Sequence, residues 1–281
     1  KIRITDFDLL LMKHQGIYFM KKTLIALTVA ASAAVSGSAM AWTANSTGGT
    51  VDIGGTLTPQ EQVTPWEIKV GDPVAGLNSN IKIGTTTVDI PLTKTIPVLG
   101  IRTQTNTSFN GANNITPQIN YHDAINTSDF SNNSTILHLN VLNAETSDKI
   151  GEMSVSMSAG AVVNYLRQDG VTSQFAINAP NAGDAFFGGV PNHPNGVDTN
   201  TVRPLLSELF SDITEHYNDQ NINKWDSSWN AKFDNPTTTY SSYYASGIKS
   251  GQNLRLTLDS PAQIDTPVIW KASLPVTISY Q

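Results

Sequence analysis

The 281-residue chain contains no cysteine. This absence excludes disulfide bonds, thiolate metal sites and a cysteine nucleophile, so stability has to come from a large hydrophobic core or from partners. Charged residues are also scarce, at 14% of the chain, and the formal net charge is −6. A composition poor in charge and rich in Asn, Ser, Thr and Gly is more typical of all-β surface proteins than of helical enzymes.

The sequence also lacks the short motifs that mark common enzyme sites. It has no P-loop, no GxSxG elbow, no HExxH pair and no EF-hand loop. The histidines beyond the N-terminal region show neither the spacing of a metal site nor that of a catalytic pair: His122, His138, His193 and His216. We therefore predict that the protein is not an enzyme and has no catalytic residue, no cofactor and no metal.

No hydrophobic run is long enough to span a membrane. The run TLIALTVAASAAV, at residues 23–35, follows a Met-Lys-Lys start and precedes an Ala-Met-Ala cleavage pattern at residues 39–41. These three regions in this order predict a secretory signal peptide over residues 20–41. Residues 1–19 are predicted to be an upstream translated segment that is not part of the mature protein.

Loss of residues 1–41 would make the chain more acidic. These residues contain five Lys or Arg and two Asp, so their removal lowers the formal net charge from −6 to −9. An acidic exported chain is a poor partner for nucleic acid or anionic lipid. We expect a protein that acts outside the cytoplasm, binds no nucleic acid and does not insert directly into a membrane.

Short segments of alternating apolar and polar residues recur along the chain, separated by polar turn residues. Such alternation indicates strands with one buried face, and many short strands with turns between them favour a β-sandwich. The polar stretch Asn143–Lys149 is predicted to be a hairpin loop. The predicted strands cover residues 66–70, 86–92, 117–121, 135–142, 151–162, 253–259 and 271–281.

The alternation fades between about residues 165 and 236. A sandwich core requires only about 100 residues, so this region is predicted to be an inserted, partly helical subdomain and a candidate receptor-binding region. The sandwich core is then formed by residues 59–164 and 237–281. Surplus chain of this size is often functional.

Helical spacing is clearest in residues 201–217, where Thr201 is predicted as the N-cap and Pro204 lies in the first turn. Acidic residues follow spacings of four, three and four along this predicted helix. They are interpreted as a solvated helix face in preference to a cation site. They are Glu208, Asp212, Glu215 and Asp219.

Two aromatic pairs lie in the predicted insertion: Phe186 with Phe187, and Trp225 with Trp229. Exposed aromatic rings can stack on the apolar faces of sugars while nearby amides and carboxylates bind the hydroxyl groups. The alternative is that each ring packs the insertion onto the sandwich. For any single ring we favour packing, because large aromatic side chains are usually substantially buried.

The segment GGTVDIGGTLTP, at residues 48–59, reads as a strand without a partner. Val51, Ile53, Gly55 and Leu57 fall on one face, which is the pattern of a half-buried strand. The segment begins shortly after the predicted cleavage point, and no hairpin turn folds it back onto a neighbouring strand. The neighbouring sequence therefore does not supply a strand with which this segment could pair.

Several stretches of the chain resemble the FaeG-type fimbrial subunits of enteric bacteria, in which the major subunit is itself the adhesin. The likeness covers nearly the whole mature chain and is densest at both ends. The stretches are MKKTLIALTVAASAAVSGSAMAW, VDIGGTLTP, WEIKVG, PVLGIRT, PQINYHD, NAETSDKIGEMSVSMSAGAV, GVTS, FFGGV, ASGIKSGQNLRLTL and LPVTISY.

This resemblance implies an incomplete immunoglobulin-like sandwich that lacks its last strand. The N-terminal strand of the next subunit completes it, a case of strand addition to an open edge. Residues 42–58 would be this donor strand, with Val51, Ile53, Gly55 and Leu57 filling the neighbour's groove. The C-terminal strand would border that groove and dock to a periplasmic chaperone through Leu274, Val276, Ile278 and Tyr280.

The resemblance also implies partners and a ligand. The partners are identical neighbouring subunits, the periplasmic chaperone, an outer-membrane usher and host glycoconjugates, on a cell-surface fimbria reached through the periplasm. The candidate glycan-binding residues are those nearest the matching part of the family: Asn178, Asn181, Asp184, Phe186 and Phe187.

Two alternatives stay open. The chain is either the major, receptor-binding subunit or a minor structural or initiating subunit of the same fimbria, and subunit abundance in fibres separates these. An alternative from a different functional class is a secreted glycan hydrolase with a sandwich fold. Such an enzyme would require paired carboxylates facing a cleft, which the sequence does not display.

Overall fold

The computed structural model describes residues 50–58, 63–263 and 267–281. The predicted signal peptide and the segment before it lie outside the described residues. The chain divides into two units, Lys1–Gln62 and Val63–Gln281. Among the described residues, no helix is long and apolar enough to cross a membrane.

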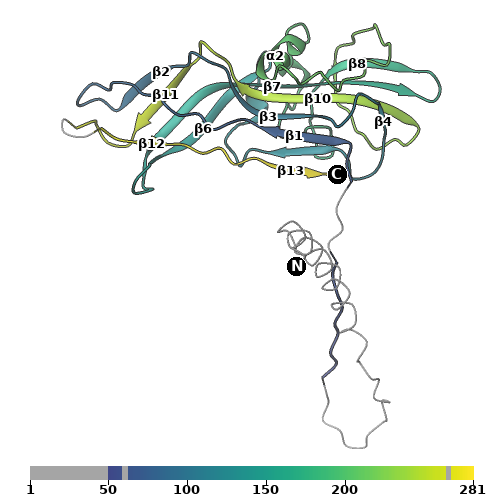
Figure 1. The fold of residues 1–281 in the computed structure, drawn as a ribbon, viewed down its shortest axis with the longest axis horizontal. Coiled ribbons are helices and arrows are strands. Elements are labelled where there is room, and N and C mark those ends of the chain that lie inside the picture. The colour runs from purple at the N-terminus through teal and green to yellow at the C-terminus, as the bar shows by residue number, and fades with distance from the viewer. Residues whose placement is uncertain (1–49, 59–62, 264–266) are drawn as a thin grey trace, which may run out of the picture. The chain divides into compact units, whose positions relative to one another are not determined.

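The unit from Val63 to Gln281 consists mostly of strands and connecting loops, which confirms the predicted all-β class (Figure 1). Its helical elements are α2 (Val202–Leu209) and the short 3-10 turns η2 (Thr127–Asp129) and η3 (Pro194–Gly196). Its strands are β1 (Trp66–Val70), β2 (Thr87–Pro91), β3 (Ile96–Thr103), β4 (Phe109–Asn110), β5 (Pro117–Asn120), β6 (Ser134–Asn143), β7 (Lys149–Arg167), β8 (Thr172–Ile177), β9 (Ser228–Trp229), β10 (Thr238–Ile248), β11 (Asn253–Leu258), β12 (Trp270–Lys271) and β13 (Thr277–Tyr280).

The 19-residue strand β7 organises the large sheet. Along one edge it pairs with β6 and then β8, and along the other edge with β11 and then β10. Beyond β10 the sheet continues through β3 to β1, and beyond β11 it ends at β2. The predicted hairpin loop is confirmed, because β6 ends at Asn143 and β7 begins at Lys149.

The second half of β7 is buried on both faces, because α2 packs over it and over β10 (Figure 1). A Cβ atom at Gly160 of β7 would lie 2.7 Å from Cγ2 of Val202, so glycine there permits this close approach. The contact forms a second hydrophobic core outside the main one. It consists of Val162, Ala176, Val202, Leu205, Leu206, Leu209, Phe210, Ile213, Tyr243 and Ala245.

The predicted helix over 201–217 is wrong in its second half, since α2 ends at Leu209. Past that point the chain makes successive turns, each closed by a backbone hydrogen bond between residues three positions apart. The carbonyl groups of Asp212 and His216 accept hydrogen bonds from the side chains of Arg102 and Thr103, respectively. Residues of low helix propensity occupy this stretch. Thr201 is also not a side-chain cap, because its hydroxyl donates to the carboxylate of Asp198.

The main core is rich in aromatic rings. The rings of Phe186 and Tyr244 stack with centroids 5.4 Å apart, and Trp66 meets Phe186 edge-on at 5.9 Å. The hydroxyl of Tyr244 lies 2.8 Å from that of Tyr121 and donates to the carbonyl of Gly189. Burial raises the pKa of Tyr121 to about 12, so its hydroxyl stays neutral and holds this network together.

We predict that Tyr244→Phe lowers the free energy of unfolding by about 1–3 kcal/mol, because it leaves the buried Gly189 carbonyl and the Tyr121 hydroxyl short of a partner. Urea unfolding followed by tryptophan fluorescence measures the change. The matched control is Tyr165→Phe, whose hydroxyl makes no hydrogen bond in the described part of the chain. Equal stability of the two variants would contradict the role given to the network.

Candidate functional site

The C-terminal segment is an incompletely covered edge of the fold. The prediction of one strand over 271–281 is wrong, because only β12 and β13 pair, β12 with β6 and β13 with β5. In the described part of the chain, β5 is the one strand that pairs with β13. The apolar side chains of the segment pack against the core but remain partly exposed: Trp270, Ala272, Leu274, Val276, Ile278 and Tyr280.

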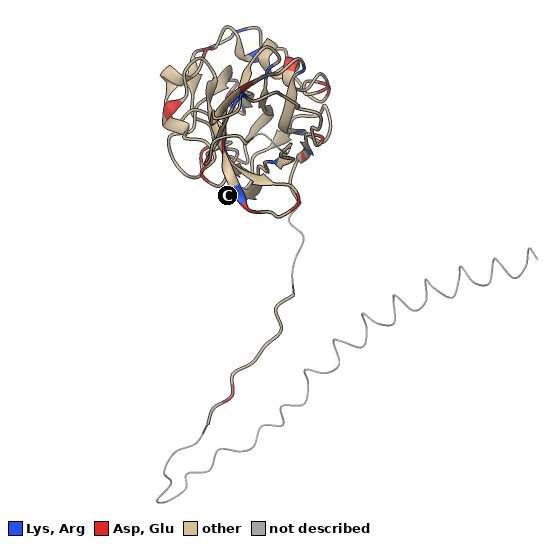
Figure 2. Ribbon diagram, turned by 90° about the vertical axis from the view of Figure 1, so that its left-hand side faces the viewer, with Lys and Arg blue, Asp and Glu red and all other residues tan. Residues whose placement is uncertain are grey.

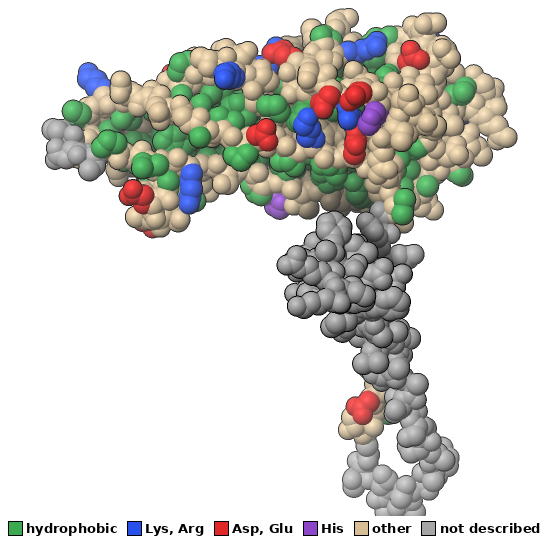
Figure 3. Space-filling view, viewed as in Figure 1, with side chains coloured by type: hydrophobic (Ala, Val, Ile, Leu, Met, Phe, Trp, Pro, Cys, Tyr) green, Lys and Arg blue, Asp and Glu red, His purple; other side chains and the backbone are tan. Residues whose placement is uncertain are grey.

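More apolar side chains are exposed nearby in the sequence. Val268 and Ile269 precede β12, Val70 ends β1, and Val74 and Ile83 lie between β1 and β2, each about half or more exposed. Figure 3 shows hydrophobic side chains spread across the width of this face of the folded unit.

The predicted donor strand is described over residues 50–58, where it forms neither helix nor strand. Its apolar side chains are almost fully exposed, at 76% for Val51, 95% for Ile53 and 98% for Leu57. No atom lies within 4 Å of the position that a Cβ would take at Gly55. Within the described residues 50–58, the hydrophobic surface of these side chains is not buried.

Three of the five candidate glycan residues are buried. Phe186 has no exposed surface, and Asp184 is 1% exposed, with its carboxylate accepting from the backbone of Asn181 and the side chain of Asn230. The Asn178 side chain accepts from Ser228 and is also buried. In this conformation Asn178, Asp184 and Phe186 build the loop and the core, and their side chains do not face solvent.

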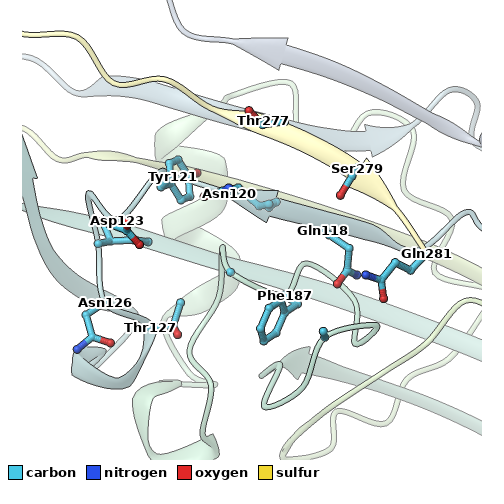
Figure 4. A pocket seen from close by; sticks show the side chains of 14 residues that line it. Gln118, Asn120, Tyr121, Asp123, Asn126, Thr127, Phe187, Thr277, Ser279 and Gln281 are labelled. Atoms are coloured by element: carbon cyan, nitrogen blue, oxygen red, sulfur yellow. The ribbon is translucent and has the colours of Figure 1, made fainter.

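The other two candidates remain accessible, since Asn181 is exposed and Phe187 is partly exposed. Phe187 lines a cleft of about 630 Å³ on the outer side of β5 and β13 (Figure 4). Sequence reasoning missed the rest of this cleft, because its residues come from four separate segments. The cleft is lined by Gln118, Ile119, Asn120, Tyr121, Asp123, Ile125, Asn126, Thr127, Ala182, Phe187, Gly188, Thr277, Ser279 and Gln281.

The tryptophans of the insertion differ in exposure. Trp225 is partly buried, with the guanidinium of Arg203 placed 5.3 Å from its ring centroid. Trp229 on β9 is 59% exposed and does not line the cleft. The favoured interpretation, that a given ring packs the insertion onto the sheet, therefore fits Trp225 better than Trp229.

The acidic residues of the predicted helix face pair with cations of the sheet and its loops. Asp212 accepts from Lys69 of β1 at 2.9 Å, Glu215 contacts Arg102 of β3 at 3.1 Å, and Glu208 contacts Lys249 at 3.2 Å. In the described ranges, no group of three His, Asp or Glu side chains is placed to hold a metal ion. Because α2 ends at Leu209, the prediction that the four acidic residues share one helix face is wrong, and three of them form ion pairs instead. Elsewhere Lys, Arg, Asp and Glu are dispersed over the fold (Figure 2).

Three carboxylates of the insertion have lowered pKa values. A hydrogen bond from Lys69 lowers the pKa of Asp212, and bonds from Lys224 and Ser173 lower that of Asp226. The Thr201 hydroxyl and the backbone at Asn200 lower the pKa of Asp198. A carboxylate with a lowered pKa in the folded state stabilises the fold above its ordinary pKa, near 4, and loses this effect as the pH falls.

Comparison with known proteins gives consistent matches along the chain. Residues 20–281 match the family model described as "Fimbrial, major and minor subunit". K88 fimbrial protein AB of Escherichia coli is 30% identical over 291 residues, which cover 93% of this chain and 100% of that protein. F41 fimbrial protein of the same organism is 27% identical over 285 residues, with the same coverage of both chains.

We predict that stability falls as the pH drops from about 5 to about 3, because the carboxylates with lowered pKa values become protonated. The Asp212→Asn variant should be less stable than the parent at pH 7, and its stability should fall less with acid. The measurement is the urea midpoint at each pH, with Asp148→Asn in the β6–β7 loop as the control. A parent and an Asp212→Asn variant with the same pH slope would rule out the assigned role of the Lys69–Asp212 pair.

Proposed function

This chain belongs to the family of fimbrial major and minor subunits, and we propose that it polymerises by donor-strand complementation. In this proposal, residues 42–58 of one subunit occupy the open edge of β13 and the half-exposed apolar face beside it on the next subunit. The observation that carries the proposal is the match between two incomplete parts, an exposed apolar strand pattern at one end and an unfilled apolar face at the other.

Burial of apolar side chains favours this insertion of one subunit's N-terminal segment into the next subunit. Burying Val51, Ile53 and Leu57 contributes about 1.5–3 kcal/mol each, before any backbone hydrogen bonds along β13 are counted. Gly55 suits a shallow position where the two backbones approach closely. A fold without disulfides thereby gains stability from its neighbour in the fibre.

The same open edge explains how a subunit reaches the cell surface. We propose export to the periplasm through the signal peptide at residues 20–41, with a chaperone covering the C-terminal segment until an outer-membrane usher replaces it by the next subunit. Leu274, Val276, Ile278 and Tyr280 would contact the chaperone. The mature location is then an extracellular fimbria.

We further propose that the fibre adheres to host glycans through the surface of the subunit and performs no catalysis. A single weak sugar site is sufficient for adhesion, because a homopolymer displays many copies and gains avidity. A hydrolase would need two carboxylates across a cleft, whereas the cleft beside β13 has one acidic lining residue, Asp123. The alternative is a minor structural or initiating subunit without receptor binding, and the abundance of the chain in purified fibres separates the two roles.

We predict that Ile53→Asp abolishes polymerisation, because it would place a charge in the dry groove of the neighbouring subunit. Electron microscopy of surface fibres and the amount of subunit bound to the chaperone are the two measurements. Chaperone binding should be unchanged, because residue 53 lies outside the C-terminal segment.

The control for this variant is Thr56→Asp, which adds the same charge on the opposite face of the strand pattern. Thr56→Asp should still form fibres. Fibres of normal length from Ile53→Asp, or equal loss of fibres in both variants, would disprove the assignment of the buried face.

A further inference from the structure

The cleft beside β13 is built from two strands and two loops. Figure 4 shows Thr277 and Ser279 on β13, Asn120 on β5, the loop that carries Asp123 and Thr127, and the ring of Phe187 on the facing loop. On β13, these cleft residues alternate with Ile278 and Tyr280, which pack toward the core. The strand therefore presents a polar face to the cleft and an apolar face to the interior.

Several polar side chains of the cleft have no hydrogen-bond partner among the described residues. His122 contacts the Thr277 hydroxyl at 2.8 Å, and the side chain of Asn126 caps η2. By contrast, the side-chain oxygen atoms of Asp123, Thr127 and Ser279 make no hydrogen bond to any described residue. These groups are available to a ligand.

The cleft is held in shape by its surroundings. Asp123 has a φ of 63°, a left-handed conformation that sets the direction in which its side chain leaves the backbone. The amide of Phe187 donates to the carbonyl of Asp184, and its own carbonyl accepts from Ile119 of β5. Because Asp184 and Phe186 are buried on either side of this turn, they position the Phe187 ring at the cleft wall.

The lining determines the class of ligand. A volume of about 630 Å³ is that of a small-molecule site. Hydroxyl, amide and carboxylate groups around one aromatic ring suit a sugar, whose hydroxyl groups need hydrogen bonds and whose ring has apolar faces. Since the lining contains Asp123 and no Lys or Arg, an anionic sugar is disfavoured.

We infer that this cleft is a binding site for a neutral saccharide, with Phe187 as the stacking ring and Asp123, Thr127 and Ser279 as hydrogen-bonding groups. The inference rests on the proposed adhesive function and gives it a location. The site shares β13 with the proposed polymerisation edge, so a neighbour's donor strand paired along β13 would stabilise the wall that carries Ser279.

The test titrates purified full-length protein with lactose, cellobiose, maltose and sialyllactose, followed by saturation-transfer NMR. We expect at least one neutral disaccharide to bind and sialyllactose to bind more weakly. Phe187→Ala should weaken binding about tenfold, and Thr127→Val and Asp123→Asn about five- to tenfold, as expected for the loss of one good contact. Asparagine at 123 keeps the left-handed conformation accessible.

Trp229→Ala removes an exposed ring outside the cleft, and Thr257→Val removes a hydroxyl on β11, so neither control should change binding. Urea midpoints identify misfolded variants, and electron microscopy of fibres reports separately on polymerisation. The inference is overturned if no neutral disaccharide binds, if the cleft variants bind like the parent, or if Trp229→Ala alone removes binding. It is also overturned if folded cleft variants lose fibres but retain saccharide binding, since the cleft would then be a subunit contact.

Discussion

The open edge of β13 is the constraint on which the remaining structure depends. In the described part of the chain, β5 is the one strand that pairs with β13, and the apolar residues of the β13 segment lie half-covered over the main core. Backbone groups and apolar side chains left in this state cost stability until a partner satisfies them. The exposed pattern of Val51, Ile53 and Leu57 has the complementary form, so an incomplete fold and an unpartnered strand are two parts of one proposed assembly.

The long strands β7 and β10 allow the protein to carry extra structure on this sheet. β7 extends beyond its pairing with β6 and β11 and there pairs with β10, and α2 packs on this part of the sheet through a second hydrophobic core. Ion pairs from Lys69 and Arg102 then bind the chain that follows α2. The chain from α2 to Glu215 is therefore attached to the sheet by a hydrophobic core and by ion pairs.

The sequence predicted best those elements whose burial is one-sided. The half-buried strands β2, β6 and β11 lie within one residue of the predicted ranges, because alternation follows directly from burial of one face. The central strands β3 and β10 were not predicted, since they are largely buried on both faces and show no alternation. The helix was overextended because side chains of β3 capture carbonyl groups that a longer helix would need, an interaction between residues more than 100 positions apart.

The candidate site was predicted only in part for a related reason. Residue type identified Phe187, but it did not distinguish this ring from the fully buried Phe186 beside it. Asp184 has the chemistry of a ligand-binding carboxylate, yet its two oxygen atoms already accept hydrogen bonds, one from the backbone of Asn181 and one from the side chain of Asn230. Asp123 and Ser279 lie 156 positions apart in the sequence and meet at one cleft only through the pairing of β5 with β13.

The most direct test of the proposed assembly uses the absence of cysteine in the chain. A variant with Ile53→Cys and one further cysteine at position 274, 276 or 278 can form a disulfide only where the two Cβ atoms approach to about 3.5–4.5 Å. Fibres of at least one such pair should give a ladder of covalent multimers on a non-reducing gel, which disappears on reduction. Normal fibres that yield only monomers for all three pairs would contradict donor-strand exchange along β13.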